Sequence, residues 1–547
     1  MKTNRSLFLI LTVILSAFIA YGLFTLPTAK NINDECFSSA RVIQDLKVIA
    51  QEPHSVAHPI ERAKVFDYLT KRLEELGSTP QIFVYPNIQA RKFVFDAKNV
   101  LAEFPPLKAS TDTTYLMLVA HYDSRHPWNL LKETMYSKGA ADDGYGLGVI
   151  LESVYQALKY RTDWNQGIKV LFTDAEEVDL QGMKAAYSQN REIFNDVGFL
   201  INVEARGPFG PALLFETSPG NERIMGLYEN HARYPFTYSL TNVVYQHMPN
   251  GTDFTIVKDS IPGINFSAVA DINHYHTNLD NIDNICEKTI QHYGEQITSI
   301  MKEYLTNPQY ADKEYLKAEE DSIYFTIPLL GMFNFSPNTY WLLNLGVLFL
   351  FLHLLHKEQN FRWGITLKQS LITIIISFVF LLVGEAIAWI SSTLTGIKFR
   401  WFGFPVITGI PFDNAVIIAS ITILTIITIV YFRKHSYRIQ ALYSSLFTIM
   451  LFSFLSMLII GENMMFFIPW CIGTIVLTLW KTTSTRFCPL LGMAVLLLHS
   501  FSFIYILAMA LTIGALGVVL WISFYNLIIL VPLAYEYLTD KASNQIS

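Results

Sequence analysis

The 547-residue sequence predicts two structures in one chain: an α/β domain with a mostly parallel, twisted sheet flanked by helices, and after it an all-α multi-pass transmembrane bundle. Between residues 38 and 306, short apolar runs of strand type alternate with helical patterns. Beyond residue 324, charged residues become sparse and long apolar runs recur. The whole chain is 51% hydrophobic with a mean hydropathy of +0.31, which is too apolar for a soluble enzyme alone.

The charge balance excludes one class of partner. The formal net charge is -6, the pI is about 6.1, and the sequence has no long basic run. Binding to a phosphate backbone needs a basic patch, so we expect no nucleic-acid partner.

The N-terminus predicts a membrane anchor. Lys2 and Arg5 precede an uncharged run over residues 6–27, which is long enough to cross the roughly 30 Å hydrocarbon core of a bilayer as a helix. The run also fits a cleaved signal peptide, but residues 26–28 (Leu-Pro-Thr) fit a cleavage site poorly, so an uncleaved anchor is preferred. Positive residues before the run place the next part of the chain outside the cytoplasm.

The predicted α/β domain opens with two amphipathic helices. Val42, Leu46 and Ile49 repeat at helical spacing, and a second helical pattern over residues 63–76 stops at Gly77. Further helices are predicted at residues 146–160 and 285–304, and about 270 residues suit one domain. Strands are predicted at residues 81–85, 99–104, 115–121, 168–174, 199–204, 212–217 and 263–269.

Seven apolar runs in the second half are long enough to cross a bilayer, which makes about eight spans with the anchor. Basic residues come after the first, third and fifth runs, beginning at Lys357, Arg433 and Lys481, so every second loop is expected in the cytoplasm. This parity agrees with a cytoplasmic N-terminus and an extracytoplasmic α/β domain. The runs lie at about residues 340–356, 369–391, 412–432, 441–460, 464–480, 489–508 and 512–535.

We therefore expect an anchor in residues 1–30, an extracytoplasmic domain in 31–325 and a multi-pass domain in 326–547. Within the last of these, Glu385 is an acid inside an apolar run. An ionisable residue in a membrane is a functional hypothesis by default, although its place near the outer end of the run also fits contact with interfacial water. No internal repeat or broken helix pair supports transport.

The ends of the strand-like runs predict a hydrolytic metal site. One run ends in His121 with Asp123 two residues on, and another is succeeded by Glu176 and Glu177. A histidine in such a pair can bind metal while the carboxylate fixes its tautomer. Adjacent buried glutamates are unfavourable unless a cation or a proton separates them, and one can bind metal while the other takes a proton from water.

Three more acids and a histidine share this pattern. Asp142 and Asp143 lie in the loop GAADDGYGLG before a predicted helix, where an N-cap explains one aspartate. Glu204 ends a further strand, and His276 comes after the last one. The resulting set of nitrogen and oxygen donors, which lacks cysteine and suits zinc, consists of His121, Asp142, Glu177, Glu204 and His276.

With these motifs, residues 37–306 resemble the co-catalytic zinc aminopeptidase family, which also contains glutamate carboxypeptidases and glutaminyl cyclases. The HxD pair, the GAxD-type loop, the Glu-Glu pair and His276-Thr277 carry the resemblance. Glu204 and the opening FSSARVIQDLKVIAQEPHSV are most similar to the membrane-embedded branch, which includes the vacuolar membrane protease and the endoplasmic reticulum metallopeptidase. That branch also has an N-terminal anchor and a multi-helix C-terminal region.

The resemblance implies two zinc ions per chain, held by the five donors above with Asp142 between the metals. It implies that Glu176 is the general base that takes a proton from metal-activated water, and that Asp123 orients His121. It also implies a peptide substrate, an aminopeptidase reaction and a zinc aminopeptidase-like fold, on a protein held in a lipid bilayer. That membrane would be the cell membrane in a bacterium, and the vacuolar or endoplasmic reticulum membrane in a eukaryote.

Three positions depart from the family pattern and bear on substrate preference rather than on metal binding. Asp143 stands where asparagine is common, Asp179 where glycine is usual, and Ala57-His58 where Gly-Ser is usual. Two other functions stay open: a glutaminyl cyclase-like acyltransferase with one zinc, and a non-catalytic membrane binding or transport protein.

Weaker features complete the prediction. Asp253 matches a family position near the site, and pairing of Cys36 with Cys286 in the extracytoplasmic domain stays open. Five other histidines fit surface or hydrogen-bonded positions better than metal binding, namely His54, His58, His126, His247 and His274.

Overall fold

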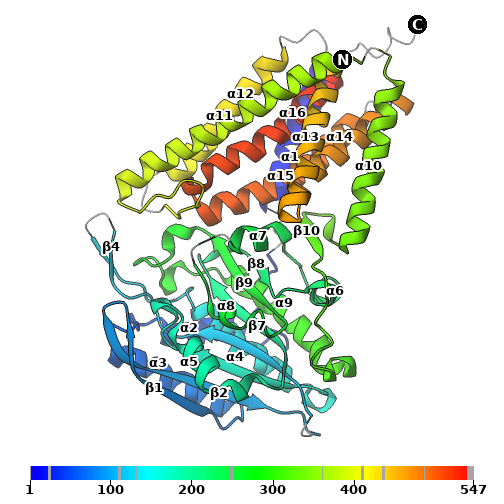
Figure 1. Ribbon diagram of the computed structural model, residues 1–547. Helices are drawn as coiled ribbons and strands as arrows, with labels where there is room; N and C mark the ends of the chain where they lie inside the picture. Colours follow the sequence, from blue (N-terminus) through cyan, green and yellow to red (C-terminus); the bar gives the residue numbers. More distant parts are fainter. Residues whose placement is uncertain are drawn as a thin grey trace. The chain divides into compact units, whose positions relative to one another are not determined.

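The chain forms two compact units, one that contains the β-sheet and one that contains the long apolar helices (Figure 1). The sheet unit consists of Thr25–Thr326 and Met332–Ser336, and the helical unit of Met1–Phe24, Ile327–Gly331 and Pro337–Ser547. The computed structural model describes residues 2–22, 26–108, 112–130, 133–246, 248, 250–359, 361–407, 412–433, 438–483, 485 and 487–538.

All seven predicted strands lie in one seven-stranded sheet of order β1-β2-β6-β3-β7-β9-β8. The four strands β6, β3, β7 and β9 are parallel, whereas β1, β2 and β8 pair antiparallel at the two sides. The predicted α/β class is confirmed, with a sheet that is mixed rather than parallel throughout. The strands are β1 (Gln81–Ala90), β2 (Phe93–Phe104), β3 (Tyr115–His121), β6 (Gly167–Thr173), β7 (Val197–Ala205), β8 (Phe209–Thr217) and β9 (Gly263–Ala270).

Helices cover both faces of the sheet, and each face has its own apolar core. Strands buried on both faces read as continuous apolar runs, which explains why β3, β6, β7 and β9 are recognisable in the sequence. One core includes α2 (Ser39–Ile49), α3 (Pro59–Glu75), α4 (Gly144–Leu158), α6 (Glu222–His231) and α9 (Glu287–Thr306), and the other includes α5 (Gln181–Gln189) and α8 (Asp253–Val257).

The parallel arrangement places the predicted site. His121 ends β3 and pairs with Thr173 at the end of the neighbouring β6, so the segments after both strands begin at the same edge of the sheet. Glu204 lies near the end of β7 at this edge. Ligand sites in open α/β sheets form at the carboxyl ends of parallel strands.

Four short strands and the helices α5 to α8 are not predicted from the sequence, because elements of ten residues or fewer show little periodic pattern. Trp128 at the start of β4 nevertheless reaches the site, since its Nε1 donates to the backbone carbonyl of His276 at 2.7 Å. Besides α5, α6 and α8, these short elements are the hairpins β4 (Trp128–Leu130) with β5 (Glu133–Met135) and β10 (Ile323–Ile327) with β11 (Gly331–Phe335), and helix α7 (Ser239–Gln246).

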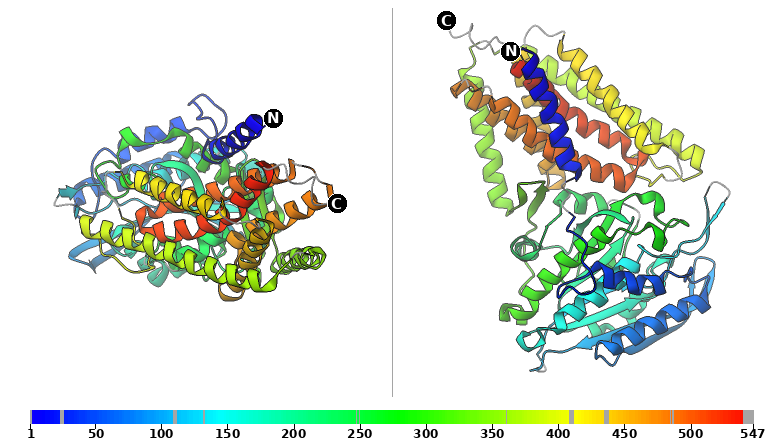
Figure 2. Two further views of the ribbon diagram at one scale, coloured as in Figure 1. Left: turned by 90° about the horizontal axis from the view of Figure 1, so that it is seen from above. Right: turned by 180° about the vertical axis from the view of Figure 1, so that it is seen from behind.

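The helical unit confirms the seven predicted runs as helices, each long and apolar enough to cross a membrane. The N-terminal helix α1 (Lys2–Gly22) packs against α15 and α16 (Figure 2), but its apolar part, Arg5–Ala20, is shorter than the other seven. The seven helices are α10 (Pro337–Lys357), α11 (Trp363–Thr395), α12 (Asp413–Arg433), α13 (Arg438–Ile460), α14 (Met464–Thr483), α15 (Phe487–Leu511) and α16 (Leu516–Leu538).

Local polar contacts explain two features of this unit. Thr512, between α15 and α16, exchanges hydrogen bonds with the backbone of Ile407, and its positive φ of 53° ends the first helix without a charged residue. Glu385 in α11 is buried, and its Oε2 accepts a hydrogen bond from the backbone N–H of Phe402 at 3.0 Å, while its Oε1 has no hydrogen-bond partner among the described residues. All four cysteines, including Cys36 and Cys286, are free thiols.

Candidate metal centre

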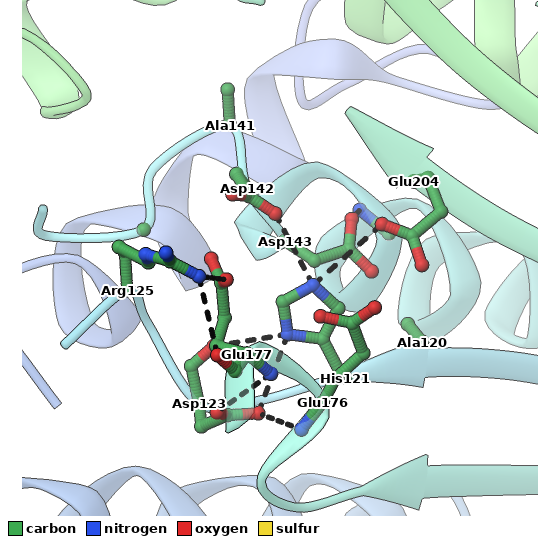
Figure 3. A network of polar contacts seen from close by, with 12 residues as sticks. Ala120, His121, Asp123, Arg125, Ala141, Asp142, Asp143, Glu176, Glu177 and Glu204 are labelled. Carbon is green, nitrogen blue, oxygen red and sulfur yellow. Dashed lines mark hydrogen bonds and ion pairs between the residues drawn. The ribbon is translucent and has the colours of Figure 1, made fainter. Parts of the chain in front are cut away.

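His121 presents one ring nitrogen to two carboxylates. Its Nδ1 donates a hydrogen bond to the backbone carbonyl of Asp123 at 2.9 Å, which leaves Nε2 available to a metal. Nε2 lies 3.2 Å from Asp142 Oδ1 and 3.6 Å from Glu204 Oε2 (Figure 3). Burial alone would lower the pKa of His121, but the three neighbouring carboxylates raise it well above its usual value. A cation between these groups would take the place of the ring proton.

Asp142 joins this histidine to a second group of donors. Its Oδ1 faces His121, while its Oδ2 lies 3.1 Å from His276 Nε2, which is also 2.8 Å from Glu177 Oε1. The structure thereby brings all five predicted metal donors together, with Asp143 as a sixth. They form two groups of three, His121 with Asp143 and Glu204, and Asp142 with Glu177 and His276, and the donor atoms within each group lie within 4.8 Å of one another.

The polar atoms at the centre of the cluster fit a bound metal. Asp142 Oδ2, Glu177 Oε1 and His276 Nε2 are buried and approach one another closely, yet none of them makes a hydrogen bond with the residues that the structure describes. Buried polar atoms normally have a partner, and an unsatisfied one costs about 1–3 kcal/mol. A cation surrounded by these nitrogen and oxygen atoms would satisfy all three.

Asp123 holds the turn that carries the two glutamates. Its Oδ1 accepts from the backbone N–H of Glu176 at 2.9 Å, and its Oδ2 from that of Glu177 at 3.3 Å. The Asp123 side chain lies 3.5 Å from His121 Nδ1, farther than its own backbone carbonyl. Its strongest contacts therefore fix the Glu-Glu turn, while the carbonyl sets the histidine tautomer.

The Glu-Glu turn requires unusual backbone conformations. Ala175 before it and Asp179 after it have φ values of 57° and 74°. A left-handed φ disfavours most residues, but glycine adopts it freely and aspartate tolerates it. The Asp179 side chain also pairs with Arg91 at 2.8 Å.

The environments of the two glutamates favour opposite protonation states. Burial and the neighbouring carboxylates of Glu204 and Glu177 raise the pKa of Glu176 well above its usual value, despite the opposing effect of His121. Burial also favours the neutral form of Glu177, but His276 and Arg125 outweigh it and hold the pKa of Glu177 well below its usual value. Only Glu176 is partly exposed. The two neighbouring carboxylates thus differ in their affinity for a proton: the surroundings of Glu176 favour its protonated form, and those of Glu177 favour the anion.

Three residues near the site have no recognisable signal in the sequence. Arg125 Nη1 pairs with Glu177 Oε2 at 2.9 Å, as Figure 3 shows. Tyr275 stacks on the ring of His276 with 3.6 Å between the ring centroids, and the guanidinium carbon of Arg206 lies 5.4 Å from the centroid of the tyrosine ring. No pattern marks these residues, because the fold alone brings them to the metal donors.

The weaker candidates take supporting or unrelated positions. Asp143 accepts from the backbone N–H of Gly146 at 3.1 Å, so it is the aspartate that caps α4. Asp253 accepts from the Thr173 hydroxyl behind the site, and burial raises the pKa of Asp253 to about 7. His247 lies outside the described residues. Neither group of donors contains the other four histidines that are predicted not to bind metal, namely His54, His58, His126 and His274.

Residues 99–301 match the model of peptidase family M28. Endoplasmic reticulum metallopeptidase 1 of Homo sapiens is 30% identical over 277 residues, which cover 46% of this chain and 30% of that protein. A vacuolar membrane protease of Candida dubliniensis is 28% identical over 311 residues, which cover 53% of this chain and 31% of that protease. The alignments thus span less than a third of either relative.

Among solved structures, Porphyromonas gingivalis glutaminyl cyclase has 20% identity and a TM-score of 0.39, over 49% of this chain and 99% of the cyclase. The family model and the two relatives carry the comparison. They confirm the resemblance that the motifs predict: the segment that holds every predicted site residue, residues 99–301, is similar to peptidase family M28.

Proposed function

We propose that this chain is a membrane-bound, zinc-dependent peptidase that acts as an aminopeptidase. The observation that carries the proposal is the pair of donor groups joined by Asp142, in which every residue but the partly exposed His276 is buried, with Glu176 beside them. Such a cluster is unfavourable to bury without a cation, and it lies within the segment that matches peptidase family M28.

Two zinc ions fit the donors. One would be held by His121, Asp142 and Glu204, and the other by Asp142, Glu177 and His276. All are nitrogen or oxygen donors, and a catalytic zinc typically has three protein ligands and one open position. Bound zinc would polarise the scissile carbonyl and lower the pKa of an attacking water.

Glu176 is the proposed general base. Its raised pKa suits a group that takes a proton from water and passes it to the leaving amine. Asp123 holds the Glu176 backbone in place, and the partial exposure of Glu176 lets its carboxylate meet a substrate. Glu177 stays ionised through Arg125 and His276, which suits a ligand and not a base.

A substrate screen tests the reaction and separates it from the alternatives. The purified full-length chain should release amines from amino acid amides and unblocked peptides, and should lose this activity when the N-terminus is acetylated. Cyclisation of N-terminal glutaminyl peptides without hydrolysis would replace the peptidase proposal by acyl transfer. Turnover of blocked peptides would show an endopeptidase.

We expect close to two zinc ions per chain, because five ligands exceed what one tetrahedral site with an open position uses. Elemental analysis of carefully prepared protein measures this directly. His276→Ala should reduce the content to about one, since it removes a donor from one group alone. One ion or none in the unaltered protein would contradict the two-metal site.

We propose that the catalytic domain lies outside the cytoplasm and the N-terminus inside, as the basic loops predict. A reporter fused after Lys357, at the end of α10, should then behave as cytoplasmic, whereas one inserted at Asp112 should be extracytoplasmic. Both reporters on one side of the membrane would refute this topology.

A further inference from the structure

A row of buried polar side chains leads from the surface to Glu204. Lys258 Nζ pairs with Glu216 Oε1 at 2.7 Å, and Asn265 Nδ2 donates to Glu216 Oε2 at 3.1 Å. Asn202 Nδ2 donates to Asn265 Oδ1 at 3.0 Å and to Glu204 Oε1 at 3.3 Å. We call these five residues the Asn202 network.

The network crosses three adjacent strands in register. Asn202 of β7 lies opposite Asn265 of β9, which lies opposite Glu216 of β8. Asn202 and Glu204 are two residues apart, so both side chains leave the same face of β7. This is the face that packs its apolar residues, such as Leu200, against α5 and α8. The polar row thus begins where that core ends.

Each amide in the network has one workable orientation. Asn202 must turn its NH₂ toward the Asn265 oxygen and the Glu204 carboxylate, because a flipped amide would turn its own oxygen toward both of these acceptors. Asn265 must turn its NH₂ toward Glu216, and it also donates to Thr252 Oγ1 at 2.8 Å. The hydrogen bonds therefore fix the direction of the whole row.

Burial makes the network costly as a purely structural feature. Asn202, Asn265 and Glu216 are all 0% exposed. Replacing buried ionic groups by apolar residues of similar volume is often neutral or stabilising, so stability alone does not call for this ion pair and these two buried amides. Their contact with a proposed metal ligand supplies a reason for them.

We propose that the Asn202 network positions Glu204 for metal binding. Asn202 holds Oε1 of the carboxylate, which leaves Oε2 turned toward His121 Nε2 at 3.6 Å. Lys258 balances the charge of Glu216, so the row delivers a hydrogen-bond donor to Glu204 instead of a second negative charge. The inference rests on the proposed zinc site and adds that these four supporting residues set its affinity on the His121 side.

Removing the donor should weaken one metal position selectively. In Asn202→Leu, one of the two zinc equivalents should bind about 10- to 100-fold more weakly, the usual effect of losing an outer-shell partner of a ligand. The other equivalent should keep its affinity, because Glu177 and His276 lie outside the network. Both zinc affinities can be measured by titrating zinc into the metal-free full-length protein in detergent, in the presence of a competing chelator. The variant Glu204→Ala lacks the ligand itself, so the equivalent that it weakens is the one that Asn202→Leu should weaken.

Asn221 provides a matched control for the loss of a buried asparagine. It is 1% exposed, donates to Thr217 Oγ1 at 2.8 Å and accepts from the backbone N–H of Ser322 at 2.8 Å. Thr217 pairs with Ile264 near the amino end of β9, at the edge opposite the metal donors. Asn221→Leu should lower the unfolding temperature about as much as Asn202→Leu and leave both zinc affinities unchanged.

The outer end of the network tests whether charge balance matters. Lys258→Met leaves Glu216 buried without a cation and should also weaken the His121-side equivalent. The double variant Lys258→Met/Glu216→Gln removes both charges and should restore the affinity. If Asn202→Leu does not fold, Asn202→Ser, which removes one of the two donated bonds, should weaken the same equivalent to a smaller extent.

The outcomes separate this inference from the proposed function. If the unaltered protein is an active zinc peptidase and Asn202→Leu binds zinc normally, the positioning role is overturned and the proposed function stands. Equal weakening of both equivalents, or the same loss in Asn221→Leu, would show a general structural effect and would also overturn it. An unaltered protein that binds no zinc would refute both proposals.

Discussion

Asp142→Asn should lose zinc from both metal positions and with it the peptidase activity. The two carboxylate oxygens of Asp142 face different histidines, at 3.2 Å from His121 Nε2 and 3.1 Å from His276 Nε2. An amide in their place removes the shared negative charge and turns an NH₂ toward one of the metals. Activity should fall by more than the roughly 10- to 100-fold that accompanies loss of an outer-shell partner. Elemental analysis and peptide hydrolysis measure the two effects.

The neighbouring Asp143 supplies the control. Asp143→Asn removes the same charge one residue along, but asparagine caps a helix as well as aspartate does, so α4 should keep its start. Asp143 also lies in the His121 group of donors, but asparagine keeps an oxygen donor there, and the proposed zinc site does not use Asp143. We therefore expect nearly normal zinc content and activity within a few-fold of the unaltered protein. If Asp143→Asn lost zinc while Asp142→Asn kept it, the assignment of the shared ligand would have to be reversed.

The main elements of the fold are predictable from the sequence because buried elements appear there as long apolar runs. Strands such as β3 and β7 are buried on both faces and form unbroken apolar runs, and the seven long helices exceed any ordinary apolar run in a soluble domain. The hairpin of β4 and β5 has strands of only three residues, which leave no periodic pattern. The end of α15 depends on a hydrogen bond between Thr512 and Ile407, far apart in the sequence.

The donors of the site are predictable for a related reason. His121 and Glu204 lie at the ends of strands, where the parallel order of the sheet gathers side chains from distant parts of the chain. The supporting residues are not predictable in this way. Arg125 contacts Glu177 and Asn202 contacts Glu204 only because the turns and the strand register bring these side chains together. The sequence does not show which carboxylate a given arginine or asparagine will contact.

The hydrogen-bond acceptor that fixes the tautomer of His121 is also not predictable from the sequence. An HxD pair predicts that the aspartate side chain holds the histidine. In the structure the backbone carbonyl of Asp123 lies closer, at 2.9 Å, because the carboxylate turns toward the N–H groups of Glu176 and Glu177. Either oxygen can accept the ring N–H, and only the path of the chain decides between them.

Glu176→Gln should abolish most of the activity while the protein keeps its zinc. The substitution is nearly isosteric, and the backbone N–H that Asp123 holds is unchanged, so the turn should survive. The glutamine amide cannot accept the proton from water. We expect the rate of peptide hydrolysis to fall by about 10²- to 10⁴-fold, the usual effect of losing a general acid-base group. Added zinc should not restore it.

Glu177→Gln provides the decisive comparison, because the two glutamates are neighbours with opposite environments. Glu177 Oε1 lies 2.8 Å from His276 Nε2, and Oε2 pairs with Arg125 at 2.9 Å. An amide there removes a charged metal donor and leaves Arg125 without its partner, so zinc should bind more weakly and excess zinc should restore part of the activity. Zinc loss in Glu176→Gln with retention in Glu177→Gln would exchange the two roles. Full peptidase activity in Glu176→Gln would rule out Glu176 as the general base, because a glutamine side chain cannot take the proton from the attacking water.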